Sequence, residues 1–178
     1  IGAVLVIFMQ AGFALVETGF CRAKHAAHVV STNFAIFGLG FVAFFVCGFA
    51  FAFSGFSYAS FGLTESIQSP STSGLIGSGE WVFLWGKSGY FLSGINQTLL
   101  PAAAAFFLYM VAFMDTTATI PTGAMAERWK WSSFLAFGFF MSMFVYPLFG
   151  NWVWGGGWLS TLGKEFGLGH GHVDFAGS

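Results

Sequence analysis

The 178 residues are 56% hydrophobic, 21% aromatic and only 7% charged, and the formal net charge is −1. Soluble domains carry roughly 25% charged residues, so a soluble fold of this composition could not cover its apolar surface. The charge balance also excludes nucleic acid as a partner, because nucleic-acid binding needs a basic patch. The composition therefore predicts an integral membrane protein.

Four apolar blocks are long enough to cross a bilayer as helices, which takes roughly 20 residues each. We expect them over about residues 1–22, 29–53, 98–126 and 131–154. The fold class expected is therefore an all-α, polytopic membrane helix bundle, with residues 1–178 in one domain. The bundle is expected to be incomplete at both ends, because Ile1 lies inside an apolar run and Ser178 lies early in a new helix.

The stretches between and after these blocks are rich in Ser and Gly and are expected to be external loops. They cover residues 54–97, with a short helix near 79–84, and residues 155–173. Basic residues favour the cytoplasmic side of a membrane. Four basic residues follow the first and third blocks closely: Arg22, Lys24, Arg128 and Lys130. Only two, Lys87 and Lys164, lie on the other side. This bias predicts a multi-pass protein of the cell membrane with cytoplasmic Arg22 and Arg128 loops and an external Trp154.

Polar residues inside the blocks need partners, since ionisable groups in a bilayer usually face the bundle interior or a pore. Gln10, Glu17 and Lys24 recur every seven residues and are expected to share one helix face. Two interpretations of Glu17 remain open: interhelical hydrogen bonding with pairing near the cytoplasmic end, or a direct part in transport. Glu127 is expected to be a structural polar residue.

The third block holds a carboxylate, Asp115, near its middle, with Thr119 and Thr122 on the same face. Asp115 is either hydrogen-bonded to a neighbouring helix or faces a pore, where it would bind cations and bias a proton path. Tyr109 and Phe113 lie four residues apart, a spacing that suits packing as well as a gate. Pro121 should bend the helix.

Histidine pairs give only weak signals for a metal site. His170 and His172 flank a glycine, and His25 and His28 lie beside basic residues at a membrane edge. No second histidine pair falls in the middle of a block, so neither a metal nor a cofactor is expected. Five tryptophans crowd the external side and suit an interfacial belt, but Trp154 stands apart because three glycines follow it.

Three sets of residues together resemble the ammonium transporter family, which includes methylammonium permeases and Rhesus glycoproteins. The first is Met9–Leu15 with Glu17, Gly19 and Arg22-Ala23-Lys24, and the second runs from Phe113 to Arg128. The third is Trp154-Gly155-Gly156-Gly157 with Asp174-Phe175-Ala176-Gly177-Ser178. The order and separation of the motifs make this resemblance specific, and it covers the whole chain.

The resemblance implies an eleven-helix bundle with an external N-terminus, assembled as a homotrimer with one pore per subunit. This chain would supply the first four helices and the start of the fifth. It further implies that Trp154 forms an external ammonium site, that Asp174 supports that site, and that Phe113 is the outer gate. The family's pore histidines would lie beyond residue 178, and Asp115 stands where the family usually has a small residue.

The function implied is ammonium transport or conduction, with capture outside, loss of a proton and passage of ammonia through an apolar pore. The alternative is an ammonium sensor, in which the same fold controls a fused signalling domain and a cation trapped at Asp115 would suit a receptor. A cytoplasmic regulatory protein is a further partner to expect. A membrane enzyme is the least supported class, because no nucleophile set or phosphate loop occurs.

Overall fold

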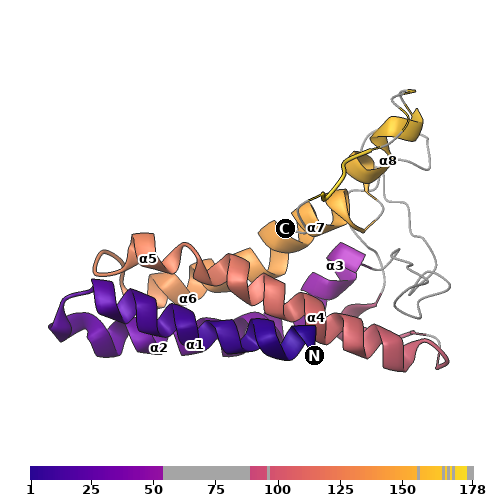
Figure 1. The fold of residues 1–178 in the computed structure, drawn as a ribbon. Helices are drawn as coiled ribbons and strands as arrows, with labels where there is room; N and C mark the ends of the chain where they lie inside the picture. The colour runs from indigo at the N-terminus through magenta and orange to yellow at the C-terminus, as the bar shows by residue number, and fades with distance from the viewer. Residues whose placement is uncertain are drawn as a thin grey trace.

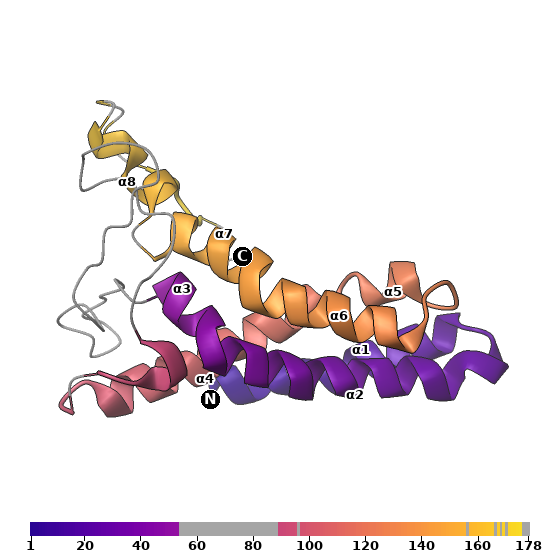
Figure 2. The same ribbon diagram turned by 180° about the vertical axis from the view of Figure 1, so that it is seen from behind.

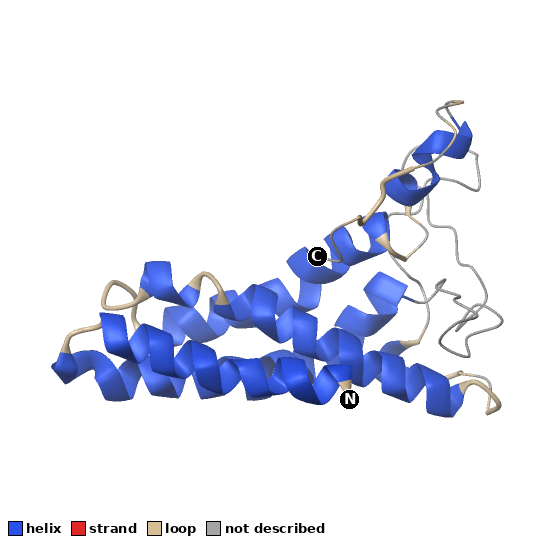
Figure 3. Cartoon of the chain, viewed as in Figure 1, coloured by secondary structure: helices blue, strands red, loops and turns tan. Residues whose placement is uncertain are grey.

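The structure is a computed structural model, and the described part consists of helices joined by loops, with no strand among those residues (Figure 3). The described residues are 1–53, 89–95, 97–155, 157–165, 167, 169 and 171–175. The all-α prediction is therefore confirmed. Inside a bilayer no water is present to bond backbone amides and carbonyls, so a spanning segment satisfies them internally by forming a helix.

The described segments form α-helices that two π-helical turns extend into longer rods (Figure 1). The α-helices are α1 (Gly2–Phe20), α2 (Ala26–Ala43), α3 (Phe49–Phe53), α4 (Leu100–Thr119), α5 (Thr122–Met125), α6 (Trp131–Phe140), α7 (Tyr146–Val153) and α8 (Trp158–Glu165). The π turns are η2 (Phe44–Gly48) and η5 (Met141–Val145), and the 3-10 turns are η1 (Ala23–His25) and η4 (Tyr90–Leu92).

Four helical stretches have the length and composition to cross a membrane, in agreement with the four predicted blocks. They are Gly2–Phe20, Ala23–Phe53, Leu100–Met125 and Trp131–Ser160. The second stretch joins α2 and α3 through η2, and the fourth includes α6 and α7 joined through η5. The chain therefore crosses back and forth along one axis, which places the α1–α2 and α5–α6 connections at the same end (Figure 1).

Helix α2 is the centre of the packing, since it contacts α1, α4 and α6. In the half of the bundle nearer Trp154, phenylalanines from α2, α3, α4 and η2 form a dense cluster around Phe107. Its ring lies 5.4 Å from the ring of Phe49, 5.5 Å from Phe41 and 5.9 Å from Phe44. A second cluster at the other end joins Ile36, Ala118, Met125 and Phe134. These contacts fix how α4 lies against α2.

The two π turns lie against each other, and a glycine allows the close approach. A Cβ at Gly48 would lie 2.7 Å from the carbonyl oxygen of Ser142 and 3.1 Å from a side-chain carbon of Pro147. Turns of this kind widen a helix locally and are common at functional sites. Beyond them, α7 and α3 continue side by side, and α8 lies at the far tip of the molecule (Figure 2).

Three expectations need correction. Helix α1 ends at Phe20 and a 3-10 turn follows, so Lys24 does not share a helix face with Gln10 and Glu17. The expected 155–173 loop contains a helix, α8. The third block is not one helix: α4 stops at Thr119, and the short α5 resumes at Thr122. Pro121 explains this break, because proline has no N–H to donate.

Most of the 54–97 loop, including the helix expected near 79–84, lies outside the described residues.

Candidate functional site: an aromatic site and two polar clusters

Trp154 ends helix α7, and the glycines that follow it allow the chain to fold back tightly. The backbone N–H groups of Trp154 and Gly155 both donate to the carbonyl of Gly150, at 2.9 Å each. A Cβ at Gly157 would lie 2.6 Å from the carbonyl oxygen of Asn151, and a Cβ at Gly155 would overlap the carbonyl of Ala52. Gly155 and Gly157 are therefore required for the close backbone contact that follows Trp154.

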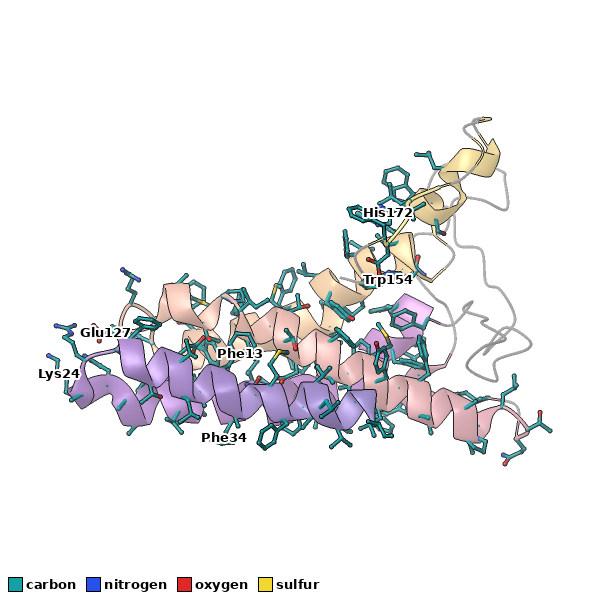
Figure 4. All side chains as sticks on the ribbon, viewed as in Figure 1. Phe13, Lys24, Phe34, Glu127, Trp154 and His172 are labelled. Atoms are coloured by element: carbon teal, nitrogen blue, oxygen red, sulfur yellow. The ribbon has the colours of Figure 1, made fainter. Side chains whose placement is uncertain are left out.

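Asp174 returns to this indole from beyond helix α8. The Trp154 Nε1–H group donates to Asp174 Oδ2 at 3.1 Å. The returning segment is tied to α8, since the backbone N–H of His172 donates to the Leu159 carbonyl at 2.9 Å. Figure 4 shows Trp154 and His172 close together at one end of the molecule. His170 and residues 176–178 lie outside the described residues.

Aromatic rings surround the inner side of Trp154. The Trp154 ring lies 6.5 Å from that of Tyr146 and 6.1 Å from that of Phe149. On helix α4, the rings of Tyr109 and Phe113 meet edge to face at 4.9 Å. Trp154, Tyr109 and Phe113 all pack, partly buried, against the phenylalanine cluster around Phe107. The predicted aromatic residues therefore border the same apolar cluster.

Asp115 lies on α4 two residues beyond Phe113, and it is only 4% exposed. Its Oδ1 atom has no hydrogen-bond partner among the described residues. A buried carboxylate oxygen without a donor is costly, because it has lost its water without gaining a hydrogen bond. The two interpretations of Asp115 differ in whether a neighbouring helix supplies a donor, and none is found for Oδ1 in the described part of the chain.

Gln10 and Glu17 belong to one hydrogen-bond network that joins α1, α2 and α4. The Gln10 side-chain amide donates to the Asn33 carbonyl at 3.0 Å and to the Thr119 hydroxyl oxygen at 3.1 Å. Asn33 Nδ2 donates to Glu17 Oε2 at 2.8 Å, and the Thr122 hydroxyl donates to Glu17 Oε1. Glu17 thus has partners on α2 and α5, and Lys24 is not one of them.

Glu127 forms an ion pair at the end opposite Trp154. Its Oε2 atom lies 2.7 Å from both Nε and a terminal nitrogen of Arg22, and its Oε1 accepts the Arg22 backbone N–H at 2.7 Å. These hydrogen bonds from Arg22 lower the pKa of Glu127 to about 2, and the side-chain bond has a larger effect than the backbone bond. Figure 4 shows Glu127 and Lys24 together at this end. The pair fastens the end of α1 to the turn that follows α5.

Two residues of these clusters were not singled out from the sequence. Asn33 is fully buried and connects Gln10 to Glu17. Its signal was visible, because it is a lone side-chain amide inside an otherwise apolar block. Tyr146 is 5% exposed, and its hydroxyl has no partner among the described residues. Its position beside Trp154 depends on how α7 packs, which residue spacing does not reveal.

Comparisons with known proteins identify the family of the chain. The profile of the Ammonium Transporter Family matches residues 1–178. Ammonium transporter Amt2 of Archaeoglobus fulgidus is 39% identical over 178 residues, covering 98% of this chain and 32% of that protein. Ammonium transporter 1 member 3 of Solanum lycopersicum is 35% identical over 180 residues, covering 99% of this chain and 33% of that protein.

A solved structure named Sensor Amt Protein is similar to the fold, with a TM-score of 0.70 and 31% identity. The alignment covers 90% of this chain and 36% of that one. The chain therefore spans about a third of the length of the relatives that it matches. The match extends from the first residue to the last and includes all three motifs. The chain belongs to the ammonium transporter family.

Proposed function

We propose that the protein transports ammonium across the cell membrane, and that Trp154 and Asp174 form its external capture site. The observation that carries this proposal is the hydrogen bond from the Trp154 indole to Asp174. It places a fixed carboxylate at the edge of an indole, and that pairing favours a small cation over a neutral ligand.

The physical problem for such a site is dehydration, because ammonium must lose water before it enters an apolar pore. The face of a tryptophan attracts a cation by about 2 kcal/mol or more when the pair is desolvated. Phe113 and Tyr109 lie against the same apolar cluster and would form the gate beneath. In this proposal ammonium gives up a proton there and ammonia continues through an apolar path.

The proposed topology places Trp154 outside the cell and the Arg22–Glu127 pair inside. The structure supports this assignment in one respect: the two basic loops lie together at the end opposite Trp154. Positively charged loops favour the cytoplasmic side. Assembly as a homotrimer, and control by a cytoplasmic regulatory protein, are expectations of the family resemblance and part of the same proposal.

The test is an ammonium-evoked current across liposomes that contain the full-length protein. We expect a saturating current that is selective for ammonium over sodium and potassium. The Asp115→Ala variant, measured alongside, shows whether the buried carboxylate tunes conduction. Saturable ammonium binding without current would contradict transport.

A sensor is the second candidate, and the similarity to Sensor Amt Protein at 31% identity favours it. The two functions differ outside the transmembrane part, because a sensor needs a signalling domain to report binding. The sequence that follows the last membrane helix therefore discriminates them. A kinase or cyclase domain there, together with absent current, would support the sensor.

A further inference from the structure

A cavity of about 730 Å³ opens between α1 and α5, at the end of the bundle opposite Trp154. Phe13, Val16 and Phe20 line its α1 side, and Gly123 and Ala126 line its α5 side. Phe13 lies inward of Glu127 along the bundle (Figure 4). The lining therefore combines apolar side chains, two phenylalanines among them, with charged ones from both segments.

Glu17 is the ionisable group that lies deepest along α1 in this cavity, between Phe13 and Phe20 in sequence. Asn33 binds its Oε2 atom and Thr122 binds its Oε1 atom. Asn33 and Thr122 are themselves buried, at 0% and 4% exposure. Both carboxylate oxygens are thus held in a fixed position from behind. A carboxylate offers about four acceptor sites, so about two remain for a donor that arrives from the cavity.

The other charged groups that line the cavity do not compensate Glu17. Arg22 and Glu127 form an ion pair with each other. One guanidinium nitrogen of Arg128 donates to the Ala124 carbonyl at 2.9 Å, along its own segment. Glu17 is therefore a carboxylate whose hydrogen-bond partners among the described residues are an amide and a hydroxyl. Neither Arg22 nor Arg128 is bonded to Glu17 among the described residues, and both hydrogen-bond partners of Glu17 are uncharged.

We propose that Glu17, with the rings of Phe13 and Phe20, forms a second site for a small monovalent cation of the ammonium class. This inference rests on the proposed function and adds an inner cation site to the outer one. A divalent ion fits poorly, since calcium takes 6–8 oxygen ligands and this cavity offers few. A hydrogen-bonding monovalent cation suits one carboxylate in a cavity that two phenylalanines also line, because an aromatic face adds cation–π attraction where it meets the cation.

The experiment measures ammonium currents in excised patches from cells that express the full-length protein, with ammonium applied to either face. The variants are Glu17→Gln, Glu17→Asp and Thr122→Val. We expect Glu17→Gln to raise the half-saturating ammonium concentration at the cytoplasmic face by roughly tenfold or more, because hydrogen bonds to charged groups are strong. The external face should change by less than about twofold. Glu17→Asp, which keeps the charge, should restore much of the affinity.

Thr122→Val is the matched control, because it removes one hydrogen bond to Glu17 and keeps the carboxylate. If Glu17 is only structural, Thr122→Val will reproduce the effect of Glu17→Gln and Glu17→Asp will not rescue it. Either that pattern, or an unchanged half-saturation at the cytoplasmic face in Glu17→Gln, overturns the inference.

A second measurement separates this inference from the proposed function. Ammonium chloride is compared with sodium chloride for its effect on the thermal unfolding of the detergent-solubilised protein, since a ligand stabilises the state that binds it. We expect ammonium to stabilise Trp154→Leu, which keeps the inner site, more than it stabilises the double variant Trp154→Leu, Glu17→Gln, which lacks both sites. If this difference in stabilisation is found but the wild type carries no ammonium current, transport is refuted and the inner cation site is still supported. Equal stabilisation of the two variants would refute the inner site.

Discussion

The indole N–H of Trp154 lies 3.1 Å from the carboxylate of Asp174, although 20 residues separate them in the chain. The bond depends on α8, since the segment between them folds back along that helix. A hydrogen bond at the ring edge fixes the orientation of the indole and leaves its faces for other contacts. The rings of Tyr146 and Phe149 contact the Trp154 ring. The orientation of the indole therefore depends on both residues of the hydrogen bond.

Replacing Trp154 with Leu should weaken ammonium capture. A desolvated cation–π contact contributes about 2 kcal/mol, which corresponds to roughly thirtyfold in the half-saturating concentration. The measurement is the concentration dependence of the current at the external face. Trp129→Leu is the matched control, because Trp129 lies near the opposite end and packs on Phe137. Unchanged concentration dependence and selectivity in Trp154→Leu would show that the site lies elsewhere.

Asp174→Asn tests whether the charge matters apart from the hydrogen bond. The amide oxygen can still accept from the indole, so the ring should keep its orientation. We expect a weaker loss of external affinity than in Trp154→Leu, and a larger loss in Asp174→Ala, which removes the acceptor too. If Asn and Ala behave alike, the charge rather than the orientation of the ring decides capture. Selectivity for ammonium over potassium, measured in the same patches, would show where that charge acts.

The four spans could be predicted because their apolar length alone identifies them, and Pro121 marked the break before α5. The π turns could not be predicted. They arise where Gly48 meets the backbone of Ser142, a contact between residues 94 positions apart (142 − 48). Helix α8 was missed because glycines border a short segment of mixed polarity. Lys24 was misplaced because a seven-residue repeat assumes that the helix continues, and α1 stops at Phe20.

For the site, the sequence supplied residue types and the fold supplied the partners. Trp154 and Asp174 were paired through the family resemblance, and nothing in their spacing brings them together. The hydrogen bonds of Glu17 to Asn33 and Thr122 also join different helices. Such contacts depend on the rotation of each helix about its axis. Polar residues in an apolar block predict that partners exist, and only packing reveals which ones.

Neutralising Asp115 should stabilise the protein. A buried polar group without a partner costs roughly 1–3 kcal/mol, and a charged one costs more. Asp115→Asn is therefore expected to raise the midpoint of thermal unfolding in detergent. The control is Asp174→Asn, the same chemical change at an exposed carboxylate. A lower midpoint for Asp115→Asn would mean that the carboxylate has a partner in the assembled protein.

The Arg22–Glu127 pair should make stability depend on acid pH. Arg22 lowers the pKa of Glu127 from an ordinary 4.5 to about 2. A lowered pKa in the folded state means that the pair stabilises the fold fully above pH 4.5. The contribution fades as pH falls toward 2, since the unfolded chain takes up the proton first. Glu127→Gln removes the pair at every pH.

The measurement compares thermal unfolding of the wild type and Glu127→Gln between pH 2 and pH 7. We expect the difference between them to be constant from pH 7 down to about 5 and then to shrink, because the linkage acts only between the two pKa values. Arg22→Gln should show the same dependence, and the double variant should add little. A difference that stays constant to pH 2 would show that the pair does not set the pKa of Glu127.

The network around Asn33 should be the most sensitive polar feature of the bundle. Asn33→Ala removes the donor to Glu17 and leaves a carboxylate oxygen without its bond. Leaving a charged group unsatisfied costs more than the roughly 1–3 kcal/mol of a neutral one. Ser31→Ala is the matched control, since Ser31 lies on the same helix and is exposed. Its hydroxyl donates to the carbonyl of His28, one turn earlier in that helix. Thermal unfolding of the two variants gives the comparison.

A double variant decides whether that loss comes from the network or from the void that Asn33→Ala leaves. Glu17→Gln should soften the effect of Asn33→Ala, because a neutral amide loses less than a carboxylate when its donor is removed. Coupling between contacting residues commonly reaches 0.5–3 kcal/mol, on the order of the effect sought. Strict additivity would assign the loss to packing. Strong coupling would show that Asn33 is kept in the bundle to hold the Glu17 carboxylate, which the inner cation site requires.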